Sequence, residues 1–269
     1  MVAVHVEEAQ VKVVILAGGF GTRILEESLL RPKPLIEIGG YPILWHIMKS
    51  YSHCGFNEFI ICCGYRGNMI KEYFANYYLY HSDVTFDFSR GGAIATHKNT
   101  AEPWKVTVVD TGLHTQTGGR LARVQRYLEN ETFMLTYGDG VADIDINALL
   151  EQHKRSNMAV TVTGVQLEGR FGLLDVDETG TTVTGFVEKP RGSNGWINGG
   201  FMVMDPGVFK YLRGDSSVLE QDLLTQACQE STLGMYAHHG FWQCMDTQRN
   251  HQYLVELWEA GQAPWKVWG

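Results

Sequence analysis

Short apolar runs that end at glycines or polar segments recur along the chain and predict buried strands. Residues 13–16 are Val, Val, Ile and Leu and lead into glycines, as expected of a buried parallel strand that feeds a loop at its carboxyl end. After Pro42, apolar side chains recur at helical spacing as far as Tyr51, and proline is tolerated at such an early helical position. A second apolar run follows at 59–63. The chain therefore begins with a predicted β-α-β unit.

The alternation of strand and helix patterns continues through the first half of the chain and then changes. It predicts helices at 67–77 and 121–128 and strands at 84–88, 106–110 and 133–137. Beyond residue 159, strand patterns crowd together at 160–165, 183–187, 196–204 and 235–238. Residues 86–119 have the least regular pattern and suggest long loops, which are often functional in compact domains. The predicted fold class is α/β: a Rossmann-like, mixed but mostly parallel, twisted sheet flanked by helices, with extra β hairpins in the second half.

Composition and charge narrow the class of protein. With 44% hydrophobic and 19% charged residues, the 269-residue chain is typical of a soluble globular protein. No apolar run approaches 18 residues, and the first ten residues lack the pattern of a secretory signal, so we expect a cytoplasmic protein without a membrane span. Five cysteines without C-x-x-C spacing argue against a disulfide framework or a zinc site. A net charge of −8 disfavours nucleic-acid binding, so any phosphate binding must be local.

A glycine-rich loop after the first predicted strand is the strongest candidate for such local binding. Glycines at 18, 19 and 21 leave backbone N–H groups free to approach an anion, and Arg23 and Lys33 add positive charge nearby. A dinucleotide fingerprint fails because Ile24 stands at its third glycine position. A P-loop fails because the last glycine is followed by Thr22 and Arg23 instead of Lys and Ser/Thr. The loop therefore suits a triphosphate that binds to backbone N–H groups and nearby cations without either of these two motifs.

What the loop does match is the L-A-G-G-x-G-T-R signature, followed by K-P-K/M-P, of the sugar-nucleotidyltransferases. Here it reads LAGGFGTR at 16–23 and RPKP at 31–34, with Arg31 in place of the usual lysine. The chain resembles this family from about residue 11 to 268, and its most specific stretches resemble the glucose-1-phosphate cytidylyltransferases. These stretches lie at 37–48, 59–65, 136–143, 197–201 and 241–247.

The resemblance implies Mg²⁺-dependent transfer of a cytidylyl group from CTP to α-D-glucose 1-phosphate, giving CDP-glucose and diphosphate. It implies catalytic roles for Arg23 and Lys33, and a metal role for Asp246. The nucleotide-binding residues that it implies are Leu16, Ala17, Gly18, Gly19, Phe20, Gly21, Thr22, Arg23, Lys33, Thr111, Thr115, Arg120 and Gly138. Those for the sugar phosphate are Gly172, Glu188, Lys189 and Asn198.

The residues themselves support part of this set. Asp139 follows the predicted strand 133–137 through Gly138, which puts a carboxylate at the ligand-binding edge of the sheet. Mg²⁺ typically takes one or two carboxylates plus substrate phosphates, so Asp139 is the first candidate ligand. Asn198 offers both a donor and an acceptor to sugar hydroxyls. Since a phosphate monoester has its second pKa at about 6, the attacking group is already an anion and needs no general base.

Each assignment has a structural alternative. Asp139 can instead cap a helix that begins near Ile144, because Asp is common at N-caps. Glu188 and Asn198 can satisfy turn backbone, and a lysine or arginine can be a solvated surface charge.

The alternatives for function are the same chemistry with another sugar 1-phosphate or with UTP or dTTP, and a non-catalytic nucleotide-sugar sensor. A sensor is expected to have lost the catalytic lysine or the metal aspartates. The crowded strands beyond residue 159 are interpreted as an extension of the sheet with sugar-binding hairpins and not as a separately folding domain. We therefore expect one domain over 11–269, with a mainly nucleotide-binding half at 11–158 and a mainly sugar-binding half at 159–269, after an extension at 1–10. The resemblance further implies a homo-oligomer with sites near its subunit interfaces.

Overall fold

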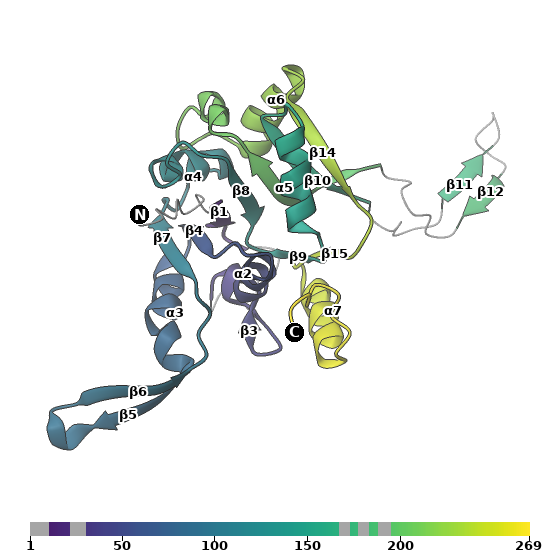
Figure 1. Ribbon diagram of the computed structural model, residues 1–269. Helices are drawn as coiled ribbons and strands as arrows, with labels where there is room; N and C mark the ends of the chain where they lie inside the picture. The colour runs from purple at the N-terminus through teal and green to yellow at the C-terminus, as the bar shows by residue number, and fades with distance from the viewer. Residues whose placement is uncertain (1–10, 22–30, 167–172, 177–182, 188–194) are drawn as a thin grey trace, which may run out of the picture.

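The computed structural model describes residues 11–21, 31–166, 173–176, 183–187 and 195–269. Within these residues, seven strands form a central sheet (Figure 1). In spatial order they are β14 (Leu233–His238), β10 (Val160–Val165), β13 (Ile197–Met204), β8 (Phe133–Tyr137), β1 (Val13–Ala17), β4 (Glu58–Cys63) and β7 (Lys105–Asp110). β13 pairs antiparallel with both of its neighbours, and the other pairs are parallel. The predicted mixed, mostly parallel sheet is thereby confirmed.

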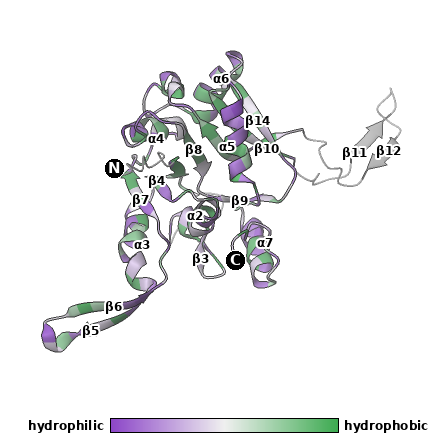
Figure 2. Ribbon diagram, viewed as in Figure 1, coloured by the Kyte–Doolittle hydropathy of each residue, from purple (hydrophilic) through white to green (hydrophobic). Residues whose placement is uncertain are grey.

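Helices cover both faces of the sheet. They are α2 (Ile43–His53), α3 (Gly67–Tyr80), α4 (Thr117–Val124), α5 (Ile146–Arg155), α6 (Thr225–Gln229) and α7 (Gln248–Glu259). Along β1 the side chains alternate between two cores, because successive residues of a strand point to opposite faces. Val13 and Ile15 pack in the core with α2, α3, α5 and α7, whereas Val14 and Leu16 pack in the core with α4 and α6. Figure 2 shows the hydrophobic residues concentrated on the strands of this sheet.

Outside the sheet, the described residues form four two-stranded ribbons. They are β2 (Glu37–Ile38) with β3 (Tyr41–Pro42), β5 (Ser82–Asp87) with β6 (Ala93–Asn99), β9 (Gly140–Ala142) with β15 (Trp242–Cys244), and β11 (Leu173–Val176) with β12 (Val183–Val187). All four pairs are antiparallel. The β5–β6 ribbon follows α3 and projects away from the body of the molecule (Figure 1).

Two sequence expectations between residues 84 and 124 need correction. The predicted strand at 84–88 exists, but it belongs to the β5–β6 ribbon and not to the central sheet. Its partner β6 lies where a loop was expected, because every residue of β6 is exposed and the strand has no buried face to give an apolar pattern. α4 begins at Thr117, four residues before the predicted start, since it includes Gly118 and Gly119. A β-carbon at either glycine would approach Ser217 or Asp215 to within 3 Å, so close packing explains both residues.

None of the helices in the described ranges is both long and apolar enough to cross a membrane.

Candidate active site

A cavity of about 510 Å³ opens beside the carboxyl ends of β1 and β8. This is the edge at which open α/β sheets bind ligands. Twelve of the residues predicted for the nucleotide and the metal line it: Leu16, Ala17, Gly18, Gly19, Phe20, Gly21, Lys33, Thr115, Arg120, Gly138, Asp139 and Asp246. The structure therefore brings the glycine-rich loop, the lysine and both aspartates to one place.

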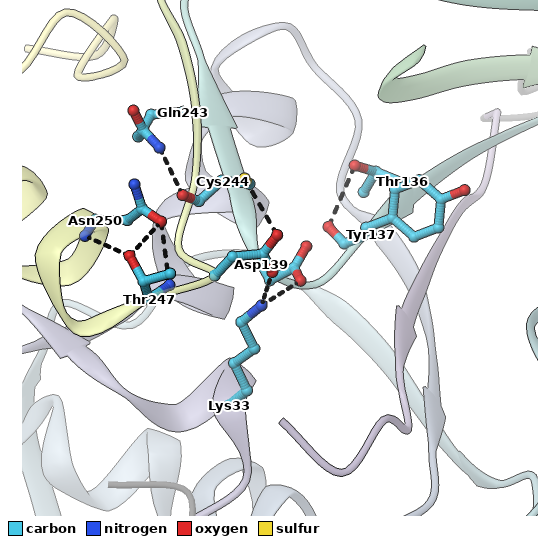
Figure 3. Close-up of polar contacts among 9 residues, drawn as sticks. Lys33, Thr136, Tyr137, Asp139, Gln243, Cys244, Thr247 and Asn250 are labelled. Carbon is cyan, nitrogen blue, oxygen red and sulfur yellow. Dashed lines mark hydrogen bonds and ion pairs between the residues drawn. The ribbon is translucent and has the colours of Figure 1, made fainter. Parts of the chain in front are cut away.

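Lys33 lies between the two aspartates. Its Nζ is 2.6 Å from Oδ2 of Asp139 (Figure 3) and 2.7 Å from Oδ1 of Asp246. The lysine side chain is only 12% exposed, whereas each carboxylate keeps about a third of its surface exposed, at 32% and 34%. Burial alone lowers the pKa of Lys33, but the charges and hydrogen bonds of Asp139 and Asp246 outweigh burial and raise this pKa above its usual value. Lys33 therefore keeps its positive charge within the cavity wall.

The pairing of β9 with β15 explains how aspartates 107 positions apart come together. Gly140 lies opposite Cys244, so the residues just outside this pair, Asp139 and Met245, also become neighbours. The backbone N–H of Met245 donates to the carbonyl of Asp139 at 2.8 Å. Asp246 is the next residue along the chain and lines the same cavity.

The start of α7 fixes the chain immediately after Asp246. The side chain of Thr247 accepts a hydrogen bond from the backbone N–H of Asn250 at 3.2 Å, and the side chain of Asn250 accepts one from the N–H of Thr247 at 3.1 Å (Figure 3). This reciprocal capping box satisfies two backbone donors that the helix itself leaves unpaired. The thiol of Cys244 points to the other oxygen of Asp246, with Sγ 3.6 Å from Oδ2.

Lys33 comes from a short 3₁₀ helix, Lys33–Leu35, that two prolines restrict. Pro32 and Pro34 limit the backbone on either side of the lysine, and Pro34 and Leu35 are buried. The N–H of Leu35 donates to the carbonyl of Pro32 at 2.8 Å. The short K-P pattern thus has a local physical meaning: it holds the backbone of Lys33 rigid while the long side chain reaches the aspartates.

Arg120 ties the glycine-rich loop to the neighbouring loop. Its Nη2 donates to the carbonyl of Gly18 at 3.0 Å, and its Nη1 donates to the carbonyls of Cys63 and Gly112 at 3.1 and 2.7 Å. Nη1 also donates to Oγ1 of Thr111 at 2.8 Å. Burial lowers the pKa of this guanidinium, although arginine remains charged in proteins. Arg120 therefore holds the shape of the cavity wall in addition to lining it.

Thr111 and Asn198 are placed differently from the other predicted residues. Thr111 is fully buried and is not among the cavity-lining residues; its hydroxyl donates to the carbonyl of Cys63 at 2.6 Å. Oδ1 of Asn198 accepts from the N–H of Gly200 at 2.9 Å, which is the backbone contact that the structural alternative anticipated. The helix cap near residue 144 is Asp145, whose side chain accepts from Ala148, so Asp139 does not cap α5.

Five predicted site residues lie outside the described part of the chain. They are Thr22, Arg23, Gly172, Glu188 and Lys189. Their predicted roles stay predictions.

The cavity also contains residues that the sequence did not single out. Leu113, His114 and Gln116, from the loop before α4, line the cavity beside the predicted Thr115, as do Thr117 at the start of α4 and Tyr137. The ring of His114 lies 6.0 Å from that of Phe20, so this loop and the glycine-rich loop are in contact. Tyr137 donates a short hydrogen bond to Glu220, and burial together with Glu220 raises the pKa of this tyrosine. The irregular sequence pattern of 111–119 was the one indication that this loop has a function. For Tyr137, the sequence showed only that it stands at the end of a predicted strand.

The donor set suits a divalent cation that shares its ligands with a substrate. No group of three or more His, Cys, Asp or Glu side chains that could hold a metal occurs among the residues described. Two carboxylates that converge on one cation do occur, and here that cation is the ammonium of Lys33. Mg²⁺ commonly takes one or two carboxylates and completes its shell with water and phosphate oxygens. Asp139 and Asp246 therefore fit the magnesium that the resemblance implies.

Comparison with known proteins adds a family to this geometry. The model of the nucleotidyl transferase family matches residues 12–247. The chain is similar to a glucose-1-phosphate cytidylyltransferase of Salmonella typhi, with 52% identity over 258 residues that cover 96% of this chain and 99% of that protein.

Solved structures agree on the fold. HddC from Yersinia pseudotuberculosis superposes with a TM-score of 0.67 at 22% identity, covering 93% of this chain and 100% of its own. An apo UDP-glucose pyrophosphorylase superposes with a TM-score of 0.67 at 14% identity, covering 94% of this chain and 99% of its own. At such low identity these two likenesses speak for the fold alone.

Proposed function

The chain belongs to the nucleotidyl transferase family, among the glucose-1-phosphate cytidylyltransferases, and from this premise we propose that it transfers a cytidylyl group from CTP to α-D-glucose 1-phosphate. The products are CDP-glucose and diphosphate. The observation that carries the proposal is the meeting of Lys33, Asp139 and Asp246 at one side of the glycine-loop cavity. A sensor that has lost catalysis is not expected to keep this set.

The reaction needs positioning and charge more than it needs acid or base. The phosphate of the sugar attacks the α-phosphorus of CTP, and diphosphate leaves. Because the attacking oxygen already carries charge, the protein has to bring two anions together and stabilise the charge that develops. Gly18, Gly19, Gly21 and Lys33 line the cavity, and their backbone N–H groups and ammonium are proposed to bind the triphosphate. Arg23 is proposed to add a second cation there.

Magnesium is the proposed cofactor, with Asp139 and Asp246 as its protein ligands. When bound beside the triphosphate, the ion would neutralise charge on the phosphate oxygens. Asp139 immediately precedes β9 and Asp246 follows β15, so the pairing of these strands and the capping box of α7 set the separation of the two carboxylates.

The sugar phosphate is proposed to bind through residues of the second half, 159–269. Lys189 would hold the phosphate, and Gly172, Glu188 and Asn198 would line the sugar ring. Nδ2 of Asn198 offers donors to a sugar hydroxyl while Oδ1 accepts from Gly200. The first half, 11–158, would bind the nucleotide.

A homo-oligomer is proposed because the projecting β5–β6 ribbon exposes large apolar side chains. Phe88 at its tip is 84% exposed, and Phe86 and Ile94 are more than half exposed. Apolar side chains gathered on one projecting element commonly mark a protein interface. We also propose a cytoplasmic location, where nucleoside triphosphates and sugar phosphates are made.

The deciding experiment is diphosphate release with α-D-glucose 1-phosphate and Mg²⁺, comparing CTP, UTP, dTTP, ATP and GTP. We expect release with CTP above all. Lys33→Ala and Asp139→Asn should each lower kcat by about 100-fold or more, as removal of a group that stabilises transition-state charge does. Lys154→Ala and Glu151→Gln, at exposed positions of α5, are matched controls that should keep wild-type rates. Faster release with UTP or dTTP would overturn the choice of base, and no release with any triphosphate or sugar phosphate would overturn the activity.

A further inference from the structure

Lys33 occupies the place where a cation belongs. Its Nζ contacts Oδ2 of Asp139 and Oδ1 of Asp246 at 2.6 and 2.7 Å. These are the distances of charge-assisted hydrogen bonds, so the ammonium completes a three-membered charge cluster without a metal. The cluster is largely buried at Lys33 and open at the two carboxylates.

A divalent ion held by both aspartates competes with this arrangement. Mg²⁺ needs carboxylate oxygens at about 2.0–2.1 Å in a nearly octahedral shell. An ammonium bonded to an oxygen on each carboxylate takes up coordination space, and its positive charge opposes a second cation a few ångströms away. The remaining oxygen of Asp246 faces the thiol of Cys244. Metal entry between the two aspartates therefore requires the ammonium of Lys33 to move.

Moving the ammonium of Lys33 away from the aspartates is energetically unfavourable unless another anion binds it. The side chain is only 12% exposed, and a buried ammonium without a partner is strongly unfavourable. The cavity that Lys33 lines is the one that the glycine-rich loop borders, and this is where the triphosphate of the proposed function would lie. A phosphate oxygen there can accept the ammonium that the aspartates release.

We propose that Lys33 is a stand-in for the metal ion in the free enzyme, so that a divalent cation binds Asp139 and Asp246 tightly only when a nucleotide phosphate takes Lys33 away. This inference rests on the proposed function, which supplies the nucleotide, and it adds an order of events. The metal enters with the triphosphate or after it, and the nucleotide-free enzyme keeps its two carboxylates neutralised by its own lysine.

The test is Mn²⁺ binding to nucleotide-free protein, followed by the electron paramagnetic resonance signal of free Mn²⁺. Lys33→Met should bind Mn²⁺ about 10-fold or more tightly than wild type, a factor within the usual range for coupling between sites. Lys154→Met, at an exposed position of α5, should bind as wild type does. The double variant Lys33→Met/Asp139→Asn should lose the gain, which would place the ion at these carboxylates. Mn²⁺ should also raise the Tm of Lys33→Met more than that of wild type.

Equal Mn²⁺ affinity of wild type and Lys33→Met would overturn the inference, and so would a gain that survives in the double variant. If Lys33→Met is too unstable to purify, Lys33→Gln repeats the comparison, because its amide can still donate to a carboxylate but carries no charge. Diphosphate release by the wild type keeps the two proposals apart. Normal CTP-dependent release with equal Mn²⁺ affinities would overturn only the inference. Absent release together with the 10-fold gain would overturn the proposed function, and the competition between Lys33 and the metal ion for the two aspartates would stand.

Discussion

Gly18 lies so close to the side chain of Arg120 that there is no room for a β-carbon. A β-carbon there would lie 2.2 Å from Nη1 of Arg120, and this guanidinium is held by the carbonyls of Gly18, Cys63 and Gly112. Gly18→Ala should therefore lower the free energy of unfolding by about 1–3 kcal/mol, the usual cost of overpacking. Urea unfolding measures it. Gly19→Ala is the matched comparison for stability, because its β-carbon would meet nothing within 4 Å. Equal losses in the two variants would contradict the role of Arg120 as a fixed neighbour.

His46 gives the fold a dependence on pH. It is fully buried; its Nε2 donates to the carbonyl of Ile38 at 2.9 Å, and its Nδ1 accepts from Nε1 of Trp265 at 3.3 Å. Burial lowers the pKa of His46 from 6.5 to about 4. Between pH 6.5 and pH 4, His46 is protonated in the unfolded chain but stays neutral in the folded chain. The stability contributed by neutral His46 is therefore full above pH 6.5 and is lost as the pH falls from 6.5 to 4, by about 3 kcal/mol in total.

The check is the free energy of unfolding between pH 7 and pH 4 for wild type and His46→Gln. Glutamine keeps a donor and an acceptor but does not titrate, so the variant should lose less stability over this range. Parallel curves for the two proteins would show that His46 is not the group responsible.

The residues of the site were largely predictable, but their contacts were not. Lys33 and Asp139 were placed by local patterns, the K-P run and the end of a strand. Asp246 came from family resemblance alone, because the β9–β15 pair that brings it to Asp139 has strands of three residues each and gives little periodicity. That the ammonium of Lys33 fills the space between the aspartates follows from the reach of a long side chain, which sequence spacing does not specify. Thr111 was expected at the nucleotide, yet its hydroxyl faces Cys63 and Arg120.

At the scale of elements, α7 links stability to the site. It begins directly after Asp246, and its first turn depends on the capping box of Thr247 and Asn250. Thr247→Ala should lower the free energy of unfolding by about 1 kcal/mol. It should also lower kcat, because the chain that carries Asp246 loses its anchor. Thr247→Ser keeps the hydroxyl and should restore both quantities, as measured by urea unfolding and diphosphate release. A loss of stability with unchanged kcat would show that the cap does not position Asp246.

Elements with a buried face were predicted well, and exposed elements were not. The expected bounds of β8 and β10 agree with the structure residue for residue, and those of β1 and β4 differ by one residue. β6 was missed because it is exposed along its whole length. α7 was not predicted either, and Leu254 is its one buried residue. The strength of a periodic pattern depends on how much of an element packs against a core.

At the scale of the whole molecule, one sheet joins the two halves of the chain. β1, β4, β7 and β8 come from the first half, and β10, β13 and β14 come from the second. The antiparallel pair of β8 with β13 is the seam between them. Asp139 leaves β8 at this seam, and Asp246 reaches it from the second half through β15. The two carboxylates proposed to hold the metal thus come from different halves of the chain, and they meet only when both halves have folded onto the same sheet.

The β5–β6 ribbon exposes large apolar side chains on which the proposed assembly of the chain can be tested. Phe86, Phe88 and Ile94 are 51%, 84% and 56% exposed, and two short strands on their own are barely stable in water. If copies of the chain cover these side chains, the wild type will scatter light as a particle heavier than one 30.3 kDa chain. The triple variant Phe86→Ser/Phe88→Ser/Ile94→Ser should then form smaller particles. Tyr253→Ser on α7, where another aromatic ring is exposed, is the control that should keep the wild-type mass. A monomeric wild type, or a triple variant of unchanged mass, would assign the ribbon no part in assembly.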